Sequence, residues 1–499
     1  MELETIIGLE VHVQLKTKSK MFCRCDNRDD QEPNSAVCHI CSGQPGALPL
    51  PNAQAIDWAI MASLALGCKV NQESKFDRKS YFYPDLPKGY QISQYDKPFG
   101  FEGSITVSID GTKKTFRIHR LHLEEDAGKL LHNGSFSLVD LNRAGTPLME
   151  IVSEPDFRTP QEAKAYMQEL RLIMRYLGVS DADMEKGHLR CDANISLRPI
   201  GTDELYPKTE IKNINSFRAV ERALTYEVER QTALWEDGQP PKIQATRGWD
   251  ENSQTTVEQR TKEEAADYRY FPEPDLPPII FSDAHVMELQ GMIPELPSAR
   301  RERFAEMYDL KNDQSQVLVE DIQSAKYFES VVSEFKAILD ELLGIEKGNL
   351  CWKNGKGKYT RLIANWLINR ISTEHSKARP KPHAESLAWL LYYLDTSTIN
   401  ASGAAIVYEK LVEIYEKNPD SKPEIANLIS ELGLEQVSNS DELEKMITSV
   451  IGTNEKVVSD VRAGKTAALQ FLVGQVMKAS KGKANPGVVQ EMLKKALEA

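Results

Sequence analysis

The sequence has 499 residues, and its 61 lysines and arginines are outnumbered by 74 aspartates and glutamates, which gives a formal net charge of -13 at pH 7. A chain of this length exceeds what one hydrophobic core organises, so we expect about two to four domains. The negative charge argues against a protein that binds nucleic acid non-specifically over its whole surface, but it is compatible with a local basic patch. No apolar run approaches the roughly 20 residues that span a bilayer, and the amino terminus lacks a signal-peptide or presequence pattern. We therefore expect a cytoplasmic protein without a membrane partner.

The first predicted element is a strand over residues 6–15, which read IIGLEVHVQL. Because the side chains of a strand alternate between its faces, the aliphatic residues share one side, and Glu10 and His12 share the other. A single pair of this kind is weak evidence for a functional site. It gains weight only if other strands repeat the pattern.

Four cysteines follow this strand, spaced as Cys23-x-Cys25 and, after twelve further residues, Cys38-x-x-Cys41. Paired thiols at this spacing are typical of a tetrahedral zinc site that closes a small loop-rich knuckle. The alternative is four free buried thiols, which the spacing favours less. All four positions of the ion would be filled by protein, so the predicted zinc is structural.

A helix is predicted over residues 52–66 and ends at Gly67. The segment 77–98 that follows is rich in aromatic, basic and proline residues. Its side chains could hold phosphates and stack on a base, or they could brace a long loop. The composition does not choose between these two interpretations.

Residues 118–156 concentrate ionisable groups more densely than a core would. We predict a strand over residues 118–125, paired with a run over residues 135–142 through an Asn-Gly turn. A third run, residues 147–153, adds Glu150. The acids either face water on a solvated hairpin or gather a hard divalent cation with their oxygen atoms.

Two later runs repeat the polar face of the first strand. In residues 189–197, Arg190 and Asp192 share one side, and in EIKNINSF the same holds for Glu210 and Lys212. Four separate runs thus place carboxylates, a histidine and basic groups on one side. We predict a sheet with one apolar face and one polar face that carries the chemistry.

The remaining elements are predicted mainly as helices. Helices are expected over residues 159–177 and 219–235, and a charged, proline-rich loop over residues 246–278. Beyond about residue 293 only helical spacing is found, over residues 297–308, 315–343, 360–371, 384–394 and 403–416 and in shorter helices over residues 422–499. In residues 467–477 the apolar side chains form a core stripe.

Three lysines follow that stripe: Lys478, Lys481 and Lys483. Lysines in the last turn of a helix often serve only the helix dipole. A patch that contacts RNA is the second interpretation.

Long strings of this chain, in consistent order, are similar to one known family. They are IGLEVHVQL from Ile7, LPKGYQISQYDKP from Leu86, HLEEDAGK from His122, DLNRAGTPLMEIVSEPD from Asp140, LRCDANISLRP from Leu189, EIKNINSF from Glu210, DYRYFPEPDLPP from Asp267 and FLVGQVMKASKGKANP from Phe471. The chain resembles GatB, the B subunit of the tRNA-dependent amidotransferases. Family members vary at the cysteine cluster, so the predicted zinc rests on spacing alone.

The resemblance implies an α+β chain in three parts. These are a cradle-like catalytic domain with a central antiparallel or mixed sheet (residues 1–293), an all-α domain (residues 294–407) and a small helical tail similar to YqeY (residues 408–499). It also implies a complex with an amidase subunit, a glutaminase that supplies ammonia, and with a small third subunit. The nucleic-acid partner would be a tRNA mischarged with glutamate or aspartate.

The implied reaction fits the predicted polar face. ATP phosphorylates the side-chain carboxylate of the mischarged amino acid, and ammonia then displaces phosphate to leave the amide. Magnesium or manganese neutralises and aligns the phosphates. The candidate metal ligands are Glu10, His12, Glu124, Glu125, Glu150 and Asp192. Of these, Glu10, His12 and Glu125 are also the catalytic candidates. The candidates for ATP and phosphate contacts are Lys88, Arg190 and Lys212.

Glu124 and Glu125 face opposite sides of an ideal strand. We favour Glu125 as the ligand, because it lies nearest the turn, where strand geometry relaxes. Two other functions stay open: a non-catalytic scaffold that holds tRNA, and a metal-dependent hydrolase of nucleic acid. The choice between Glu-tRNA(Gln), Asp-tRNA(Asn) or both also stays open.

Overall fold

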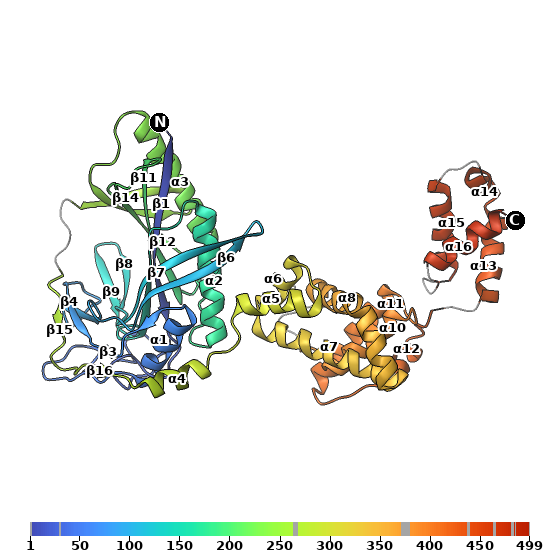
Figure 1. Ribbon diagram of the computed structural model, residues 1–499, viewed down its shortest axis with the longest axis horizontal. Coiled ribbons are helices and arrows are strands. Elements are labelled where there is room, and N and C mark those ends of the chain that lie inside the picture. Colours follow the sequence, from blue (N-terminus) through green and yellow to red (C-terminus); the bar gives the residue numbers. More distant parts are fainter. Residues whose placement is uncertain are drawn as a thin grey trace. The chain divides into compact units, whose positions relative to one another are not determined.

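The computed structural model describes residues 2–28, 31–262, 268–370, 380–436, 440–462, 466–480, 484 and 486–498 (Figure 1). The chain divides into two compact units, Met1–Arg300 and Arg301–Ala499. Within the described ranges, every helix is too short or too polar to pass through a bilayer. Each unit is described by itself.

The first unit is built on a nine-stranded sheet with the order β14-β13-β12-β11-β1-β10-β7-β6-β2. Its strands are β1 (Leu3–Gln14), β2 (Lys69–Val70), β6 (Gly100–Ile109), β7 (Thr112–Glu125), β10 (Pro147–Ser153), β11 (Leu189–Pro199), β12 (Thr209–Ile214), β13 (Gln244–Asp250) and β14 (Thr255–Lys262). Neighbouring strands are antiparallel except β12 and β13, which are parallel. The sheet is therefore mixed, and the α+β expectation is confirmed.

One face of this sheet is apolar, as the alternation in β1 predicts. Leu9, Val11 and Val13 are fully buried in the core of the unit. Three helices contribute side chains to the same core and pack on the strands: α1 (Ala53–Ala65), α2 (Pro160–Leu177) and α3 (Phe217–Glu236) (Figure 1). The other face of β1 is therefore left for polar side chains.

Local sequence explains where these helices begin and end. The Thr159 side chain accepts a hydrogen bond from the Glu162 backbone at the start of α2, the Glu162 side chain accepts one from the Thr159 backbone, and Pro160 opens the helix. Gly178 ends it with a φ of 72°, a left-handed conformation that favours glycine. The Asn52 side chain caps the start of α1. The predicted helices over residues 52–66 and 159–177 are confirmed.

Two predictions for this unit were wrong. The Asn-Gly turn joins β8 (Lys129–Asn133) to β9 (Phe136–Asp140) in a separate hairpin, because both edges of β7 are already occupied by β6 and β10. Residues 246–262 are not a loop but belong largely to β13 and β14. The charges there misled the prediction, since Arg247 in β13 lies 3.2 Å from the buried Glu227 and needs no solvent.

The rest of the first unit consists of short elements. A three-stranded sheet joins β15 (Phe271–Pro272), β4 (Asp77–Ser80) and β5 (Tyr90–Ser93), and β16 (Ile279–Ile280) pairs with β3 (Glu73–Ser74). The helix α4 (Asp283–Gly291) follows, and α5 (Pro297–Tyr308) crosses the boundary between the units.

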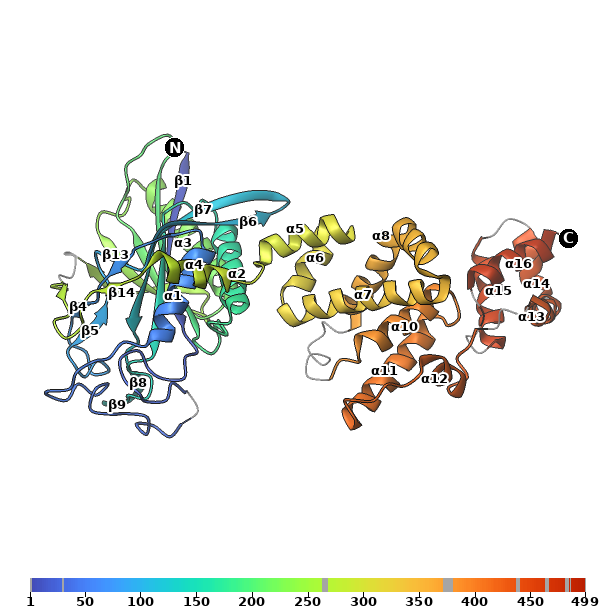
Figure 2. The same ribbon diagram turned by 60° about the horizontal axis from the view of Figure 1, so that its bottom comes forward.

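The regular structure of the second unit is helical throughout its described residues (Figure 2). Its helices after α5 are α6 (Asn312–Val319), α7 (Ile322–Leu343), α8 (Ile345–Arg370), α10 (Ala384–Asp395), α11 (Ala401–Lys417), α12 (Ile425–Glu431), α13 (Ser440–Thr453), α14 (Glu455–Arg462), α15 (Thr466–Ala479) and α16 (Pro486–Glu498). The helix predicted over residues 315–343 is two helices, because the Asp321 side chain caps a new helix start there.

The last four helices share a hydrophobic core of their own, in which Leu472, Val476 and Leu493 are fully buried. Thus α13, α14, α15 and α16 form a small helical bundle at the carboxyl end. The division of the chain into three domains at residues 293 and 407 stays a prediction.

Candidate functional site

The polar face of the sheet is assembled by strand register around β1. His12 lies opposite Glu150 of β10 on one side and opposite Arg190 of β11 on the other, and Glu10 lies opposite Asp192. Residues directly opposite each other on neighbouring strands share a face. The predicted polar face therefore exists as one surface over several strands.

His12, Glu124 and Glu150 form a compact group, which we call the acidic–histidine cluster. One ligand atom from each lies within 4.8 Å of the others. The Nε2 atom of His12 is 3.4 Å from a Glu150 oxygen and 3.6 Å from a Glu124 oxygen. Both carboxylates are buried. An imidazole and two carboxylates converging on one point make a suitable site for a divalent cation.

The carboxylates of this cluster favour positive charge beside them. Burial opposes the charged form of His12, but the hydrogen bond with Glu150 and the charges of Glu150 and Glu124 outweigh it and raise the pKa to about 9. Burial likewise opposes ionisation of Glu150, yet the two histidines beside it hold its pKa well below the usual range. A divalent cation would take the place of the His12 proton, because an imidazole that ligates a metal must be neutral.

A second histidine, His122 of β7, lies beside this cluster and was missed by the sequence analysis. Its Nε2 atom is 3.3 Å from the Glu150 carboxylate and 3.7 Å from that of Glu124. His122 is almost fully buried. It lies two residues before Glu124 on the same strand, so the alternation that pairs Glu10 with His12 could have found it.

A second group of charges lies farther along the same face. Lys212 donates to Asp192 at 2.6 Å and lies 3.3 Å from Glu210. Asn194 donates to Glu10 at 2.9 Å. Glu10 and Asp192 therefore already have protein partners, and the structure does not bring them into the acidic–histidine cluster.

A cavity of about 660 Å³ opens beside Glu10. Its lining combines Glu10 and Asn194 with the lysines Lys208 and Lys242 and with apolar side chains that include Tyr206. A mixed lining of this kind, apolar with a few polar groups, is typical of a small-molecule site.

Glu125 is placed apart from the cluster. Its carboxylate accepts a 2.6 Å hydrogen bond from Lys88 and a 3.0 Å bond from the Ile92 backbone. Glu125 is the last residue of β7, so both glutamates keep strand geometry. Their side chains therefore face opposite sides of the strand, as alternation requires. The structure thus places Glu124, not Glu125, beside His12, because the expected relaxation near the turn does not occur. The choice of Glu125 as the metal ligand stays a prediction.

The other predicted phosphate contact, Arg190, is also engaged. It donates to Asp126 at 2.8 Å, and Arg143 lies 3.6 Å from the same carboxylate. Each of Lys88, Arg190 and Lys212 is therefore held by a carboxylate.

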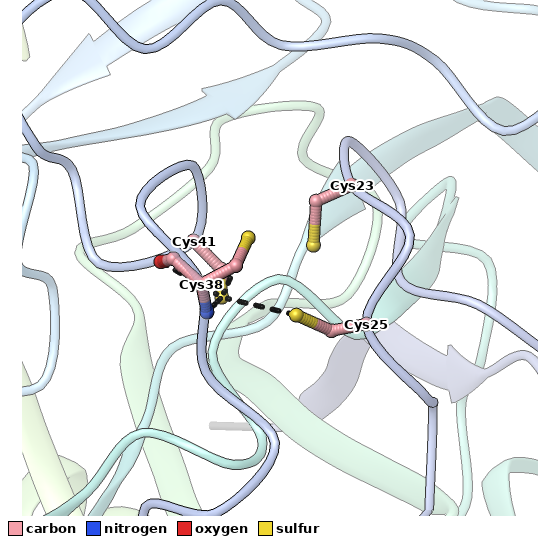
Figure 3. A group of neighbouring side chains, drawn as sticks. All are labelled: Cys23, Cys25, Cys38 and Cys41. Atoms are coloured by element: carbon pink, nitrogen blue, oxygen red, sulfur yellow. Dashed lines mark hydrogen bonds between the residues drawn. The ribbon is translucent and has the colours of Figure 1, made fainter.

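The four predicted cysteine ligands do converge, in a group that we call the cysteine cluster (Figure 3). The Sγ atom of Cys41 lies 4.0 Å from that of Cys25 and 3.9 Å from that of Cys38. Sulfurs bound to zinc at about 2.3 Å in a tetrahedron are separated by about 3.8 Å. Backbone N–H groups of Cys38 and Ile40 donate to sulfur, which suits thiolates. The donor set and its spacing fit zinc.

Only part of the predicted RNA patch can be placed. Lys478 is exposed in the last turn of α15. Lys481 and Lys483 lie outside the described residues.

Two family models match the chain. One, described as the GatB/GatE catalytic domain, matches residues 5–287, and the other, described as the GatB domain, matches residues 352–497. The chain belongs to the GatB family. The acidic–histidine cluster, the cavity and the cysteine cluster of this GatB chain all lie within the part matched by the catalytic-domain model.

Curated relatives match this GatB chain over its full length. The B subunit of the aspartyl/glutamyl-tRNA(Asn/Gln) amidotransferase from Carboxydothermus hydrogenoformans is 46% identical, over 99% of both chains. The proteins of the same name from Persephonella marina and Dehalococcoides mccartyi are 46% and 47% identical, over 99% or more of each chain. The family inferred from the sequence strings is confirmed.

Proposed function

We propose that this GatB-family chain activates the side-chain carboxylate of glutamate or aspartate carried by a mischarged tRNA, as the B subunit of an amidotransferase. The observation that carries the proposal is the acidic–histidine cluster on the polar sheet face, with the large cavity beside Glu10 on the same face. The names of the relatives supply the substrate class, aspartyl- and glutamyl-tRNA. The proposed site of action is the cytoplasm, where tRNA is used.

The chemistry explains why such a cluster is needed. A carboxylate is a poor electrophile, so it must be phosphorylated by ATP before ammonia can displace phosphate. This step brings a triphosphate next to another anion and requires compensating positive charge. His12, Glu124 and Glu150 would hold magnesium or manganese, which neutralises and aligns the phosphates. Lys79 adds positive charge beside the cluster. Burial lowers its pKa, but nearby groups that include Glu124 and Glu150 raise it by more, so the ammonium stays protonated.

The cavity beside Glu10 is the proposed nucleotide site. Lys208 and Lys242 line it and are both exposed, and Lys208 is only loosely paired, at 3.8 Å from Glu10. The apolar lining residues Leu205, Tyr206 and Ile243 can cover a base.

Lys208 and Lys242 replace the three predicted phosphate contacts in this proposal. Lys88, Arg190 and Lys212 each donate a hydrogen bond of 2.6–2.8 Å to a carboxylate. A phosphate would have to displace that carboxylate before it could bind them. The two cavity lysines carry no such short hydrogen bond among the described residues, so their charge is available to an incoming anion.

Partners complete the reaction. We propose that an amidase subunit supplies the ammonia and that a small third subunit is also present in the complex. The cysteine cluster would hold structural zinc, since its sulfurs already lie at near-tetrahedral separations. Lys478, with Lys481 and Lys483, is proposed to contact the tRNA backbone.

The decisive experiment replaces Glu124 by Gln in the assembled complex. The change keeps the size of the side chain and removes one charge from the metal site, so ATP-dependent phosphorylation of Glu-tRNA should be lost while tRNA binding survives. Glu102→Gln is the matched control, since Glu102 is exposed and pairs with Lys69 at the surface. Formation of ADP that depends on mischarged tRNA is the measurement.

Other outcomes favour the alternatives. Unchanged turnover in Glu124→Gln would favour a tRNA-holding scaffold. Release of nucleotides from RNA without ATP would favour a hydrolase.

A further inference from the structure

A fully buried lysine, Lys20, lies against the cysteine cluster. Its ammonium donates to the carbonyl oxygen of Ala36 at 2.8 Å and to that of Leu141 at 3.3 Å. It also lies 3.8 Å from the Sγ atom of Cys41. The side chain has no exposure to solvent.

Lys20 lacks the partner that a buried lysine normally has. Among the described residues, no carboxylate lies within 4.0 Å of its ammonium, although other basic groups of this unit, such as the partly buried Lys88, pair with acids. Burying a charge without a counter-charge is costly. Within the described ranges, the nearest group able to carry negative charge is Cys41, at 3.8 Å, so the cysteine cluster is the candidate source of the counter-charge.

The net charge of the cysteine cluster differs between its metal-loaded form and four neutral thiols. Four thiolates around one zinc ion carry a net charge of about -2, which a buried ammonium half neutralises. Four neutral thiols would leave the ammonium without compensation. The presence of Lys20 therefore argues against four neutral thiols and favours a cluster that carries thiolate charge at Cys41, as the metal-loaded cluster does.

We propose that Lys20 is the built-in counter-cation of the metal-loaded cysteine cluster and couples its occupancy to the loop that leads into β10. This inference rests on the proposed zinc site and is independent of the proposed transferase activity. Lys20 is a positioning residue, because it would act through Cys41 and through backbone carbonyls.

The coupling follows from the contacts of residues 140–147. Besides the bond from Lys20 to the Leu141 carbonyl, the Asn142 side chain accepts from the Ala36 backbone at 2.8 Å, and the Met21 backbone donates to Gly145 at 2.7 Å. A side chain added at Gly145 would lie 3.5 Å from both Cys41 and Lys20 and 3.9 Å from the Glu125 carboxylate. The loop thus packs directly between the cysteine cluster and Glu125.

The test compares Lys20→Met with Lys18→Met in the full-length chain. Methionine fills nearly the same volume without charge, and Lys18 is an exposed lysine two residues away that serves as the control. Zinc affinity is measured by competition with a chromophoric chelator. We expect Lys20→Met to weaken zinc binding by about 10- to 100-fold, as is usual for groups that support metal ligands, and Lys18→Met to leave it unchanged.

Thermal melting supplies a readout that a purely structural role would not give. Removing zinc from the wild type should lower the melting temperature more than removing it from Lys20→Met, because the metal-free variant no longer buries a lone cation. Hydrogen exchange in residues 140–147 should rise on chelation in the wild type and less so in the variant.

The outcomes separate the claims. Equal zinc affinity in wild type and Lys20→Met would overturn the role of Lys20 and leave the zinc site standing, whereas a wild type that binds no zinc would overturn both. If Lys20→Met does not fold, Lys20→Gln supplies a neutral N–H donor without the charge, and unchanged zinc affinity in that variant would overturn the proposal equally.

Discussion

The acidic–histidine cluster and the cysteine cluster lie in the same unit but are held in different ways. Strands position the first: His12, Glu124 and Glu150 come from three neighbouring strands, whose hydrogen bonds and apolar core exist without any ion. Loops position the second, around Cys23 and Cys41, where the chain has little regular structure. A site on a sheet can therefore be formed before its metal arrives, whereas a loop site depends on its metal for order.

Removal of zinc should have the largest effect and tests this difference directly. Structural zinc contributes on the order of 10 kcal/mol of binding free energy in small metal-dependent domains, so chelation should open the segment 20–51. The strands β1, β10 and β11 should keep their protection, as measured by hydrogen exchange. Equal loss of protection in the sheet would contradict the comparison.

The second effect concerns turnover. Glu150→Gln removes one carboxylate of the acidic–histidine cluster while the strand around it stays intact. A metal ion stabilises the charge of the transition state by several kcal/mol, and about 1.4 kcal/mol corresponds to a tenfold change in rate. We therefore expect the rate of ATP-dependent phosphorylation of mischarged tRNA to fall by about 1,000-fold. The melting temperature should also fall, because His12 and His122 lose a carboxylate partner, so the rate per folded molecule is the deciding measurement. A variant that loses stability but keeps its rate would show that Glu150 is structural.

The neighbours Glu124 and Glu125 sharpen the comparison within one strand. Glu125→Gln breaks the ion pair of the buried Glu125 with the partly buried Lys88 and should cost about 3 kcal/mol of unfolding free energy. Because Glu125 faces away from His12, the variant should bind manganese as the wild type does, as followed by electron paramagnetic resonance. Weaker manganese binding would place Glu125 at the metal after all.

The smallest effect is expected at the helix that supports the sheet. Thr159→Ala removes the side-chain cap of α2 and should cost about 1 kcal/mol of unfolding free energy. The helix packs on the apolar face, so the rate per folded molecule should stay unchanged. Chemical denaturation and the tRNA-dependent ADP assay together check both statements.

Much of this architecture could be predicted from the sequence, for reasons visible in single residues. Alternation in β1 placed Glu10 and His12 on the polar face, and caps such as Thr159 and Gly178 fixed the ends of α2. The spacing of the four cysteines was enough to group them. Each of these signals is local, because it involves residues a few positions apart.

The errors concern information that local patterns do not carry. Which strand pairs across the Asn-Gly turn depended on which strand edges were free. The strands β13 and β14 could form at a charged segment because Glu227, in a preceding helix, neutralises Arg247. The proposed role of Lys20 required knowing that the lysine is buried and that no carboxylate of the described residues lies within 4.0 Å of its ammonium. The cavity with Lys208 and Lys242 likewise exists only when distant segments come together.

The most direct test of the central claim is manganese binding to the complex, titrated by electron paramagnetic resonance in the presence of ATP. A site held by His12, Glu124 and Glu150 predicts one tight ion in the wild type that is lost in His12→Ala and kept in Glu102→Gln. An unchanged tight site in His12→Ala would contradict the account, because the metal would then be bound elsewhere.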